Sequence, residues 1–227
     1  MPAELDGPRV EPRSGPARAL VVFLHGYGAD GNDLIDIGRA WQGLLPQAAF
    51  VSPHAPEPCG QAPVGRQWFA LTFRDPDERW LGCLKAAPMV DSFLDAELKR
   101  RNLPSSALAL VGFSQGTMMA LHVGLRRATS PFAIVGYSGL LAAPAEATVE
   151  RVASEIRSRP PVLLIHGDRD ENVRVEQTHA MSGALRSHGK DVEDVIIPGA
   201  THYFTEQQNA QARRALFDFL RRHLNRS

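Results

Sequence analysis

Ser114 stands in the sequence GFSQG, residues 112–116, which has the pattern G-x-S-x-G. The apolar run ALALVGF, residues 107–113, precedes it, and an amphipathic helical pattern follows it. In this setting the pattern predicts a nucleophile elbow, because glycines two residues before and after the serine leave room for a sharp strand-to-helix turn that exposes its hydroxyl. A glycine-rich turn with an incidental serine is the alternative, and the strand and helix on either side favour the nucleophile.

A serine hydroxyl is a weak nucleophile until a base takes its proton, so the elbow requires an acid and then a histidine later in the chain. The apolar run PVLLIHG is followed by Asp168 and Asp170, and the run DVIIPG is followed by His202. The order alone leaves both aspartates open as the acid. Four other histidines fall on helical patterns and are interpreted as structural: His122, His179, His188 and His223.

The glycine-rich segment GYGADG, residues 26–31, follows a predicted strand and allows two interpretations. A dinucleotide-binding loop would need an acidic residue at the end of the next strand, where the chain has VSP, residues 51–53. Attack on an ester carbonyl instead creates an oxyanion that needs preorganised N–H donors. We expect these donors to be the backbone N–H groups of Tyr27 in this loop and Gln115 in the elbow.

The elements that position these residues can be read from short apolar runs that alternate with helical patterns. Unbroken aliphatic runs suit strands that are buried on both faces, so the chain predicts an α/β fold with a mostly parallel sheet and helices on both faces. We expect a single domain over residues 1–227. The expected strands span residues 19–25, 48–53, 107–113, 132–139, 161–167 and 194–199.

A long connection separates the second expected strand from a helix expected around residues 88–102. Large apolar residues gather in it: Trp68, Phe69, Leu71, Phe73, Trp80 and Leu81. They could form an acyl pocket or its lid, and Trp68, Phe69, Leu71 and Trp80 are the candidate substrate-binding residues. Packing of the loop on the core, or a dimer contact, explains them equally well.

Composition argues against several classes of partner. The formal net charge is zero, with 25 Lys plus Arg and 25 Asp plus Glu, so no one-sided field favours nucleic acid or an anionic membrane. Cys59 and Cys83 form neither a disulfide framework nor a zinc motif, and we expect free thiols, no metal and no cofactor. No signal-peptide pattern or apolar run of about 18 residues occurs, which predicts a cytoplasmic protein without membrane insertion.

The combination of LHGYGADGNDL, GFSQG, GYSG and HGDRD with a late histidine resembles the carboxylesterase, acyl-protein thioesterase and lysophospholipase family of α/β hydrolases. The similarity runs from about Ala19 to His202. It implies Ser114 as nucleophile, His202 as base and the second aspartate of HGDRD, Asp170, as the acid that orients the base. It also implies hydrolysis of carboxyl esters, lysophospholipids or acyl thioesters without a cofactor, and a possible homodimer.

Three positions depart from the family pattern. The acid loop continues with Val173 and Arg174 where the family has Val-Pro, and Thr201 precedes the histidine where the family has glycine. The segment QWFALTF lacks the aspartate of the family's W-[YF]-D. The missing aspartate bears on substrate preference. From the Ser, Asp and His order together with the resemblance, we expect a serine carboxylesterase for short- to medium-chain esters of small molecules. The alternatives are a lysophospholipase or acyl-protein thioesterase and, from another class, a non-catalytic ligand-binding scaffold.

Overall fold

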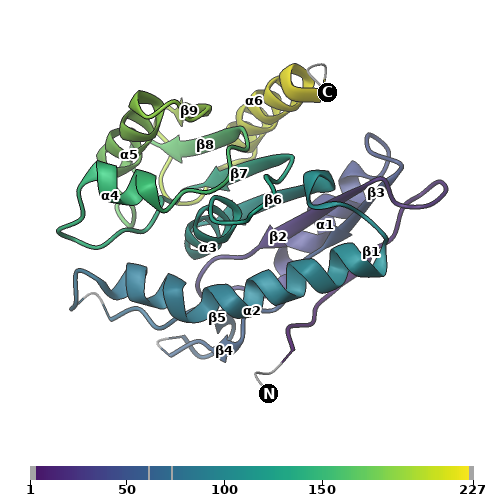
Figure 1. The fold of residues 1–227 in the computed structure, drawn as a ribbon, viewed down its shortest axis with the longest axis horizontal. Coiled ribbons are helices and arrows are strands. Elements are labelled where there is room, and N and C mark those ends of the chain that lie inside the picture. Colours follow the sequence, from purple (N-terminus) through teal and green to yellow (C-terminus); the bar gives the residue numbers. More distant parts are fainter. Residues whose placement is uncertain (1–3, 61, 73, 225–227) are drawn as a thin grey trace.

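The computed structural model describes residues 4–60, 62–72 and 74–224 and contains a seven-stranded sheet in the order β1-β3-β2-β6-β7-β8-β9 (Figure 1). The edge strand β1 (Arg9–Val10) runs antiparallel to β3, and all other neighbours in this sheet are parallel. The parallel strands are β2 (Ala19–Leu24), β3 (Ala48–Val51), β6 (Leu108–Phe113), β7 (Ala133–Tyr137), β8 (Val162–Gly167) and β9 (Val192–Ile197).

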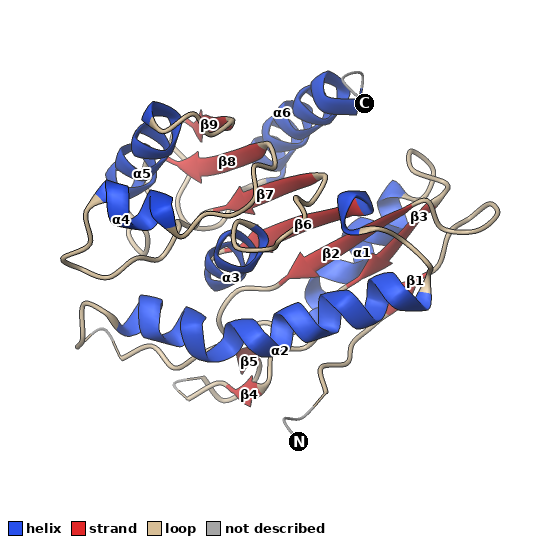
Figure 2. Cartoon of the chain, in the orientation of Figure 1, coloured by secondary structure: helices blue, strands red, loops and turns tan. Residues whose placement is uncertain are grey.

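Helices cover both faces of this sheet (Figure 2). One face carries α1 (Gly31–Trp41) and α6 (Glu206–Leu224). The other face carries α2 (Glu78–Arg100), α3 (Gln115–Gly124), α4 (Val149–Ser154) and α5 (Val175–Ser187). Side chains alternate along each strand, so Val22 of β2 packs in the core beneath α2 and α3 while Phe23 packs in the core beneath α1 and α6.

The six apolar runs all form strands, and the predicted parallel sheet with helices on both faces is confirmed. The sequence did not predict β1, the hairpin of β4 (Glu57–Pro58) and β5 (Arg66–Gln67), or the 3₁₀ turn η1 (Ser105–Ala107). These segments are two or three residues long, so hydrophobic periodicity cannot reveal them.

Helix α2 begins at Glu78, so the expectation of a loop through Trp80 with a helix only from about residue 88 is wrong. Pro88 lies inside the helix. A proline there removes a backbone hydrogen bond, but α2 buries Cys83 and Ala86 before it and Val90 and Phe93 after it. This packing on both sides of Pro88 keeps the helix continuous. Phe73, which the sequence placed in the same apolar cluster, lies outside the described residues.

The carboxyl ends of β2 and β6 form the crevice that positions the site. These strands are neighbours, yet the chain leaves β2 toward β3 on one side and β6 toward β7 on the other. Such a reversal of strand order is where ligands bind in open α/β sheets. Within the described residues no helix combines the length and the apolar character that crossing a bilayer requires.

Candidate active site

Ser114 occupies the turn between β6 and α3 with φ 53° and ψ −115°. A non-glycine residue with this backbone conformation is strained, and such strain concentrates at functional turns. A Cβ added at Gly116 would lie 1.8 Å from the carbonyl oxygen of Leu24, and one at Gly112 would lie 2.5 Å from that of Gly116. The two glycines are therefore required for the close approach of β2, β6 and α3, as the sequence predicted.

The structure brings Ser114, His202 and Asp170 together from the ends of three different strands. His202 follows β9, and its Nε2 lies 2.9 Å from Ser114 Oγ. Asp170 follows β8, and its Oδ2 lies 2.8 Å from His202 Nδ1. These distances are ordinary hydrogen bonds, so the imidazole can accept the serine proton at one nitrogen while the carboxylate orients it through the other.

Asp170 is buried, and its two carboxylate oxygens have different neighbours. Oδ1 accepts hydrogen bonds from the backbone N–H groups of Asn172 and Val173, each at 2.9 Å. Oδ2 faces His166 Nε2 at 3.2 Å in addition to His202. These contacts hold the carboxylate in place beside the His202 ring, where it can stabilise an imidazolium.

Asp168 takes a different partner from its neighbour Asp170. Its Oδ1 accepts a hydrogen bond at 2.7 Å from the backbone N–H of Gly199, in the loop that leads to His202. Asp168 thus contacts the loop that carries the base, because the parallel pairing of β8 with β9 places the two following loops side by side. The geometry selects Asp170 as the partner of His202.

The loop that carries His202 is fixed at two further points. Ser138 follows β7, and its hydroxyl donates to the carbonyl oxygen of His202 at 2.9 Å. Thr201, where the family has glycine, is exposed, and its hydroxyl donates to the carbonyl oxygen of Tyr203 at 3.1 Å. The added side chain thus bonds to the loop itself and does not displace the imidazole.

Tyr27 and Gln115, the expected oxyanion donors, both line the pocket that contains Ser114 and His202. Gln115 is the first residue of α3, and the first N–H groups of a helix have no partner within the helix. The carbonyl oxygen of Gly26, in the peptide that ends in the Tyr27 N–H, lies 2.8 Å from His25 Nδ1. A trans peptide points its N–H away from its carbonyl, so this bond turns the Tyr27 N–H away from the His25 ring.

His25 is fully buried, and its tautomer is fixed by its partners. Its Nε2 accepts from the backbone N–H of Ala55 at 3.0 Å, so Nδ1 carries the proton that it donates to Gly26. Burial lowers the pKa of His25, which keeps the ring neutral. We did not predict roles for His25, His166 or Ser138, although a polar residue at the carboxyl end of a buried strand is a signal that could have found them.

A pocket of about 200 Å³ opens over Ser114 and His202. Leu71 lines it, as the sequence proposed, but the other three candidate substrate residues do not. Trp68 and Phe69 are buried in the core at 1% and 2% exposure, and Trp68 Nε1 donates to the carbonyl oxygen of His25. Trp80 lies on α2, where its ring packs 5.3 Å from that of His122. These three expectations are corrected, since Trp68 and Phe69 are buried in the core and the partly exposed Trp80 packs against α3.

The side chain of Gln115 attaches the elbow to the segment before Leu71. Its Oε1 accepts from the Trp68 N–H at 2.8 Å, and its Nε2 donates to the Phe69 carbonyl oxygen at 2.7 Å. Both bonds are buried. The amide therefore holds the pocket wall on the residue that follows the nucleophile.

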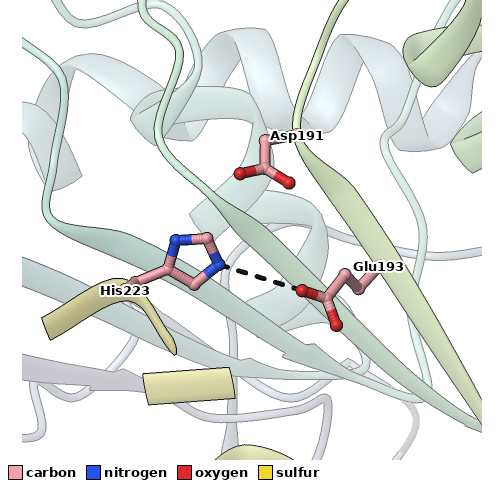
Figure 3. A group of neighbouring side chains, drawn as sticks. All are labelled: Asp191, Glu193 and His223. Carbon is pink, nitrogen blue, oxygen red and sulfur yellow. Dashed lines mark ion pairs between the residues drawn. The ribbon is translucent and has the colours of Figure 1, made fainter. Parts of the chain in front are cut away.

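A second group of titratable residues lies at the amino end of β9, away from the strand ends that carry the catalytic residues. Asp191, Glu193 and His223 bring ligand atoms within 4.8 Å of one another (Figure 3). These residues come from β9 and α6 and the segment before β9, which meet only in the fold, so their positions in the sequence do not reveal the cluster. Glu193 also pairs with Arg222 at 2.5 Å and lies 3.8 Å from His223 Nε2. We interpret the cluster as a tether of α6 to the amino end of β9, whereas His202 follows its carboxyl end.

Comparison with known proteins places these features in a family. The sequence profile described as phospholipase/carboxylesterase matches residues 5–221. Esterase YpfH of Escherichia coli strain K12 is 29% identical over 187 residues, which are 82% of this chain and 77% of that protein. Acyl-protein thioesterase 1 of Schizosaccharomyces pombe is 31% identical over 179 residues, which are 75% of this chain and 76% of that protein.

Solved structures give the same result. The crystal structure of esterase PE8 aligns with a TM-score of 0.87 and 39% identity, covering 96% of this chain and 100% of that one. SOBER1 of Arabidopsis thaliana aligns with a TM-score of 0.74 and 23% identity, covering 92% of this chain and 100% of that one, and shows the same fold.

Proposed function

Because the chain belongs to the phospholipase/carboxylesterase family, we propose that it is a serine carboxylesterase that cleaves short- to medium-chain esters through an acyl-enzyme. The observation that carries the proposal is the continuous hydrogen-bonded path from Ser114 through His202 to buried Asp170. A ligand-binding scaffold has no need of a strained serine at the end of such a path.

The proposed reaction has two halves. Ser114 Oγ attacks the ester carbonyl while His202 Nε2 takes the hydroxyl proton, and the backbone N–H groups of Tyr27 and Gln115 bind the oxyanion that forms. His202 then returns the proton to the departing alcohol. Water, activated by the same nitrogen, releases the acid. Asp170 stabilises the imidazolium in both halves.

The size of the pocket supports a small acyl group. At about 200 Å³ it is smaller than the roughly 300–1,000 Å³ typical of drug-sized ligand sites. Acyl-protein thioesterase or lysophospholipase activity is the second candidate, which the 31% identity to acyl-protein thioesterase 1 supports.

A fluorophosphonate probe tests the proposal directly. We expect it to label the wild-type protein and not Ser114→Ala, and we expect the same variant to lose turnover of aryl esters. A series of aryl esters, a lysophospholipid and a palmitoyl thioester measured under one set of conditions then ranks the substrate classes. Absence of labelling in the folded wild-type protein would support the non-catalytic scaffold.

A further inference from the structure

Arg79 is a charged residue in the catalytic pocket that the proposed reaction does not use. It lies in the first turn of α2 and lines the pocket together with Ser114, Leu71 and Asn172. It also lines a neighbouring hollow of about 620 Å³. Arg79 therefore lies at the junction of the catalytic pocket and a larger hollow.

The surroundings of Arg79 leave its charge poorly compensated. Within the described residues, its one polar partner is the carbonyl oxygen of Asn172, at 3.4 Å from Nη2. The two acids that precede it bond elsewhere: Asp77 accepts from the Ala145 N–H at 2.6 Å and Glu78 accepts from the Thr72 N–H at 2.5 Å, and in the described part of the chain neither forms an ion pair with Arg79. The carboxylate of Asp170 is already surrounded by its own donors.

The location itself is unfavourable for a cation. The N-terminal turn of a helix carries a partial positive charge, which favours acidic side chains and disfavours basic ones. Burial also lowers the pKa of Arg79, and the adjacent Glu78 opposes this only in part. An anion bound beside the guanidinium would relieve both costs, and arginine suits carboxylate and phosphate groups because its planar fork can donate two parallel hydrogen bonds.

We propose that the ester cleaved at Ser114 carries an anionic oxyacid group, a carboxylate or a phosphate, which Arg79 binds at the junction of the two hollows. This inference rests on the proposed function and narrows its substrate class. The group can belong to the acyl part or to the alcohol part of the ester.

Two matched pairs of esters test the inference and distinguish the two parts. The acyl pair is phenyl hexanoate and the phenyl half-ester of adipic acid, which differ in a terminal carboxylate. The alcohol pair is phenyl hexanoate and 3-carboxyphenyl hexanoate. For each pair, the ratio of kcat/KM for the charged ester to kcat/KM for the neutral ester is measured in wild type, Arg79→Gln, Arg79→Lys and Arg74→Gln, with folding checked by circular dichroism.

We expect wild type to prefer the charged ester in one pair and Arg79→Gln to lower that ratio at least tenfold, whereas Arg79→Lys keeps most of it. Arg74→Gln removes the same charge from the neighbouring hollow only and should leave the ratio within about twofold, because screening by salt weakens more distant charges. The wild-type preference should also fall on addition of sodium chloride, which needs no variant.

Equal losses on charged and neutral esters in Arg79→Gln would make Arg79 a brace of the acid loop and overturn the inference. A wild-type preference for the neutral ester in both pairs would overturn it too. Neither result touches the proposed function as long as phenyl hexanoate is hydrolysed by wild type and not by Ser114→Ala. Failure of all three esters in folded wild-type protein would overturn both.

Discussion

Asp168 and Asp170 leave the same strand two positions apart and serve different loops. Asp170 is buried against His202, whereas Asp168 is exposed and binds the backbone N–H of Gly199. The chemistry that each carboxylate must supply differs accordingly. Asp170 must carry a negative charge toward an imidazolium, but Asp168 needs only one oxygen that can accept a hydrogen bond.

This difference predicts opposite outcomes for the same substitution. Asp170→Asn should lower kcat by about three to four orders of magnitude, because an amide favours the wrong imidazole tautomer and cannot stabilise its charged form. Asp168→Asn should lower kcat less than about threefold, because the amide oxygen can still accept from Gly199. The measurement is kcat of both variants on one aryl ester, with folding checked by circular dichroism.

Asp168→Ala serves as the control for the loop contact, since it deletes the acceptor and should cost more than Asp168→Asn. If Asp168→Asn proved inactive while Asp170→Asn retained activity, the assignment of the acid would be wrong.

At the scale of elements, strands and the loops after them could be predicted from the sequence, and the contacts between loops could not. Long apolar runs reveal a buried strand wherever it lies, so Ser114 and His202 were placed at strand ends correctly. The segment around Trp68 has no period, because its contacts come from residues distant in the sequence: Trp68 bonds to His25 and Gln115, and Phe69 bonds to Gln115. Neither the contacts of the Gln115 side-chain amide nor the residue at which α2 begins can be predicted without knowing those partners.

The two bonds of the Gln115 side chain link the turn that carries Ser114 to the segment before Leu71, and we expect their loss to change the pocket. Gln115→Ala leaves the Trp68 N–H and Phe69 carbonyl buried without this partner, at a cost of about 1 to 3 kcal/mol each. It keeps the backbone N–H proposed for the oxyanion. We therefore expect lower stability in urea, retained labelling of Ser114 by a fluorophosphonate, and a flatter dependence of kcat/KM on acyl length as Leu71 loses its support.

Gln67→Ala is the matched control for this substitution. The Gln67 side chain bonds to Gly60 and Glu57 within the β4–β5 hairpin, so its loss should leave the acyl-length dependence as in wild type. An unchanged dependence of kcat/KM on acyl length in Gln115→Ala would show that the two bonds of the Gln115 side chain do not shape the pocket.

At the scale of the whole molecule, the carboxyl ends and the amino ends of the parallel strands have separate roles. Ser114 and His202 lie at the carboxyl ends of the strands, and the cluster of Asp191, Glu193 and His223 lies at the amino end of β9. Dialysis against a strong chelator should therefore leave kcat/KM on an aryl ester unchanged, as should His223→Gln. Loss of activity that added zinc restores would contradict the proposed serine mechanism.

Buried histidines predict how the whole fold responds to acid. Burial lowers the pKa of His25, His166 and His122, the last to about 4 with a smaller effect from Arg126. In the unfolded chain each histidine has a pKa of about 6.5. Below that pH the unfolded state therefore binds more protons than the folded state, and the free energy of unfolding decreases as the pH falls toward about 4.

His122 allows a test away from the active site, because in the described part of the chain its buried Nδ1 has no hydrogen-bond partner. We expect His122→Leu to reduce the loss of unfolding free energy between pH 7 and pH 5 by about 1 to 2 kcal/mol, measured by urea unfolding at both pH values. His188→Leu, at an exposed position after α5, should retain the wild-type loss. Equal acid sensitivity in His122→Leu and wild type would mean that His122 does not titrate with unfolding.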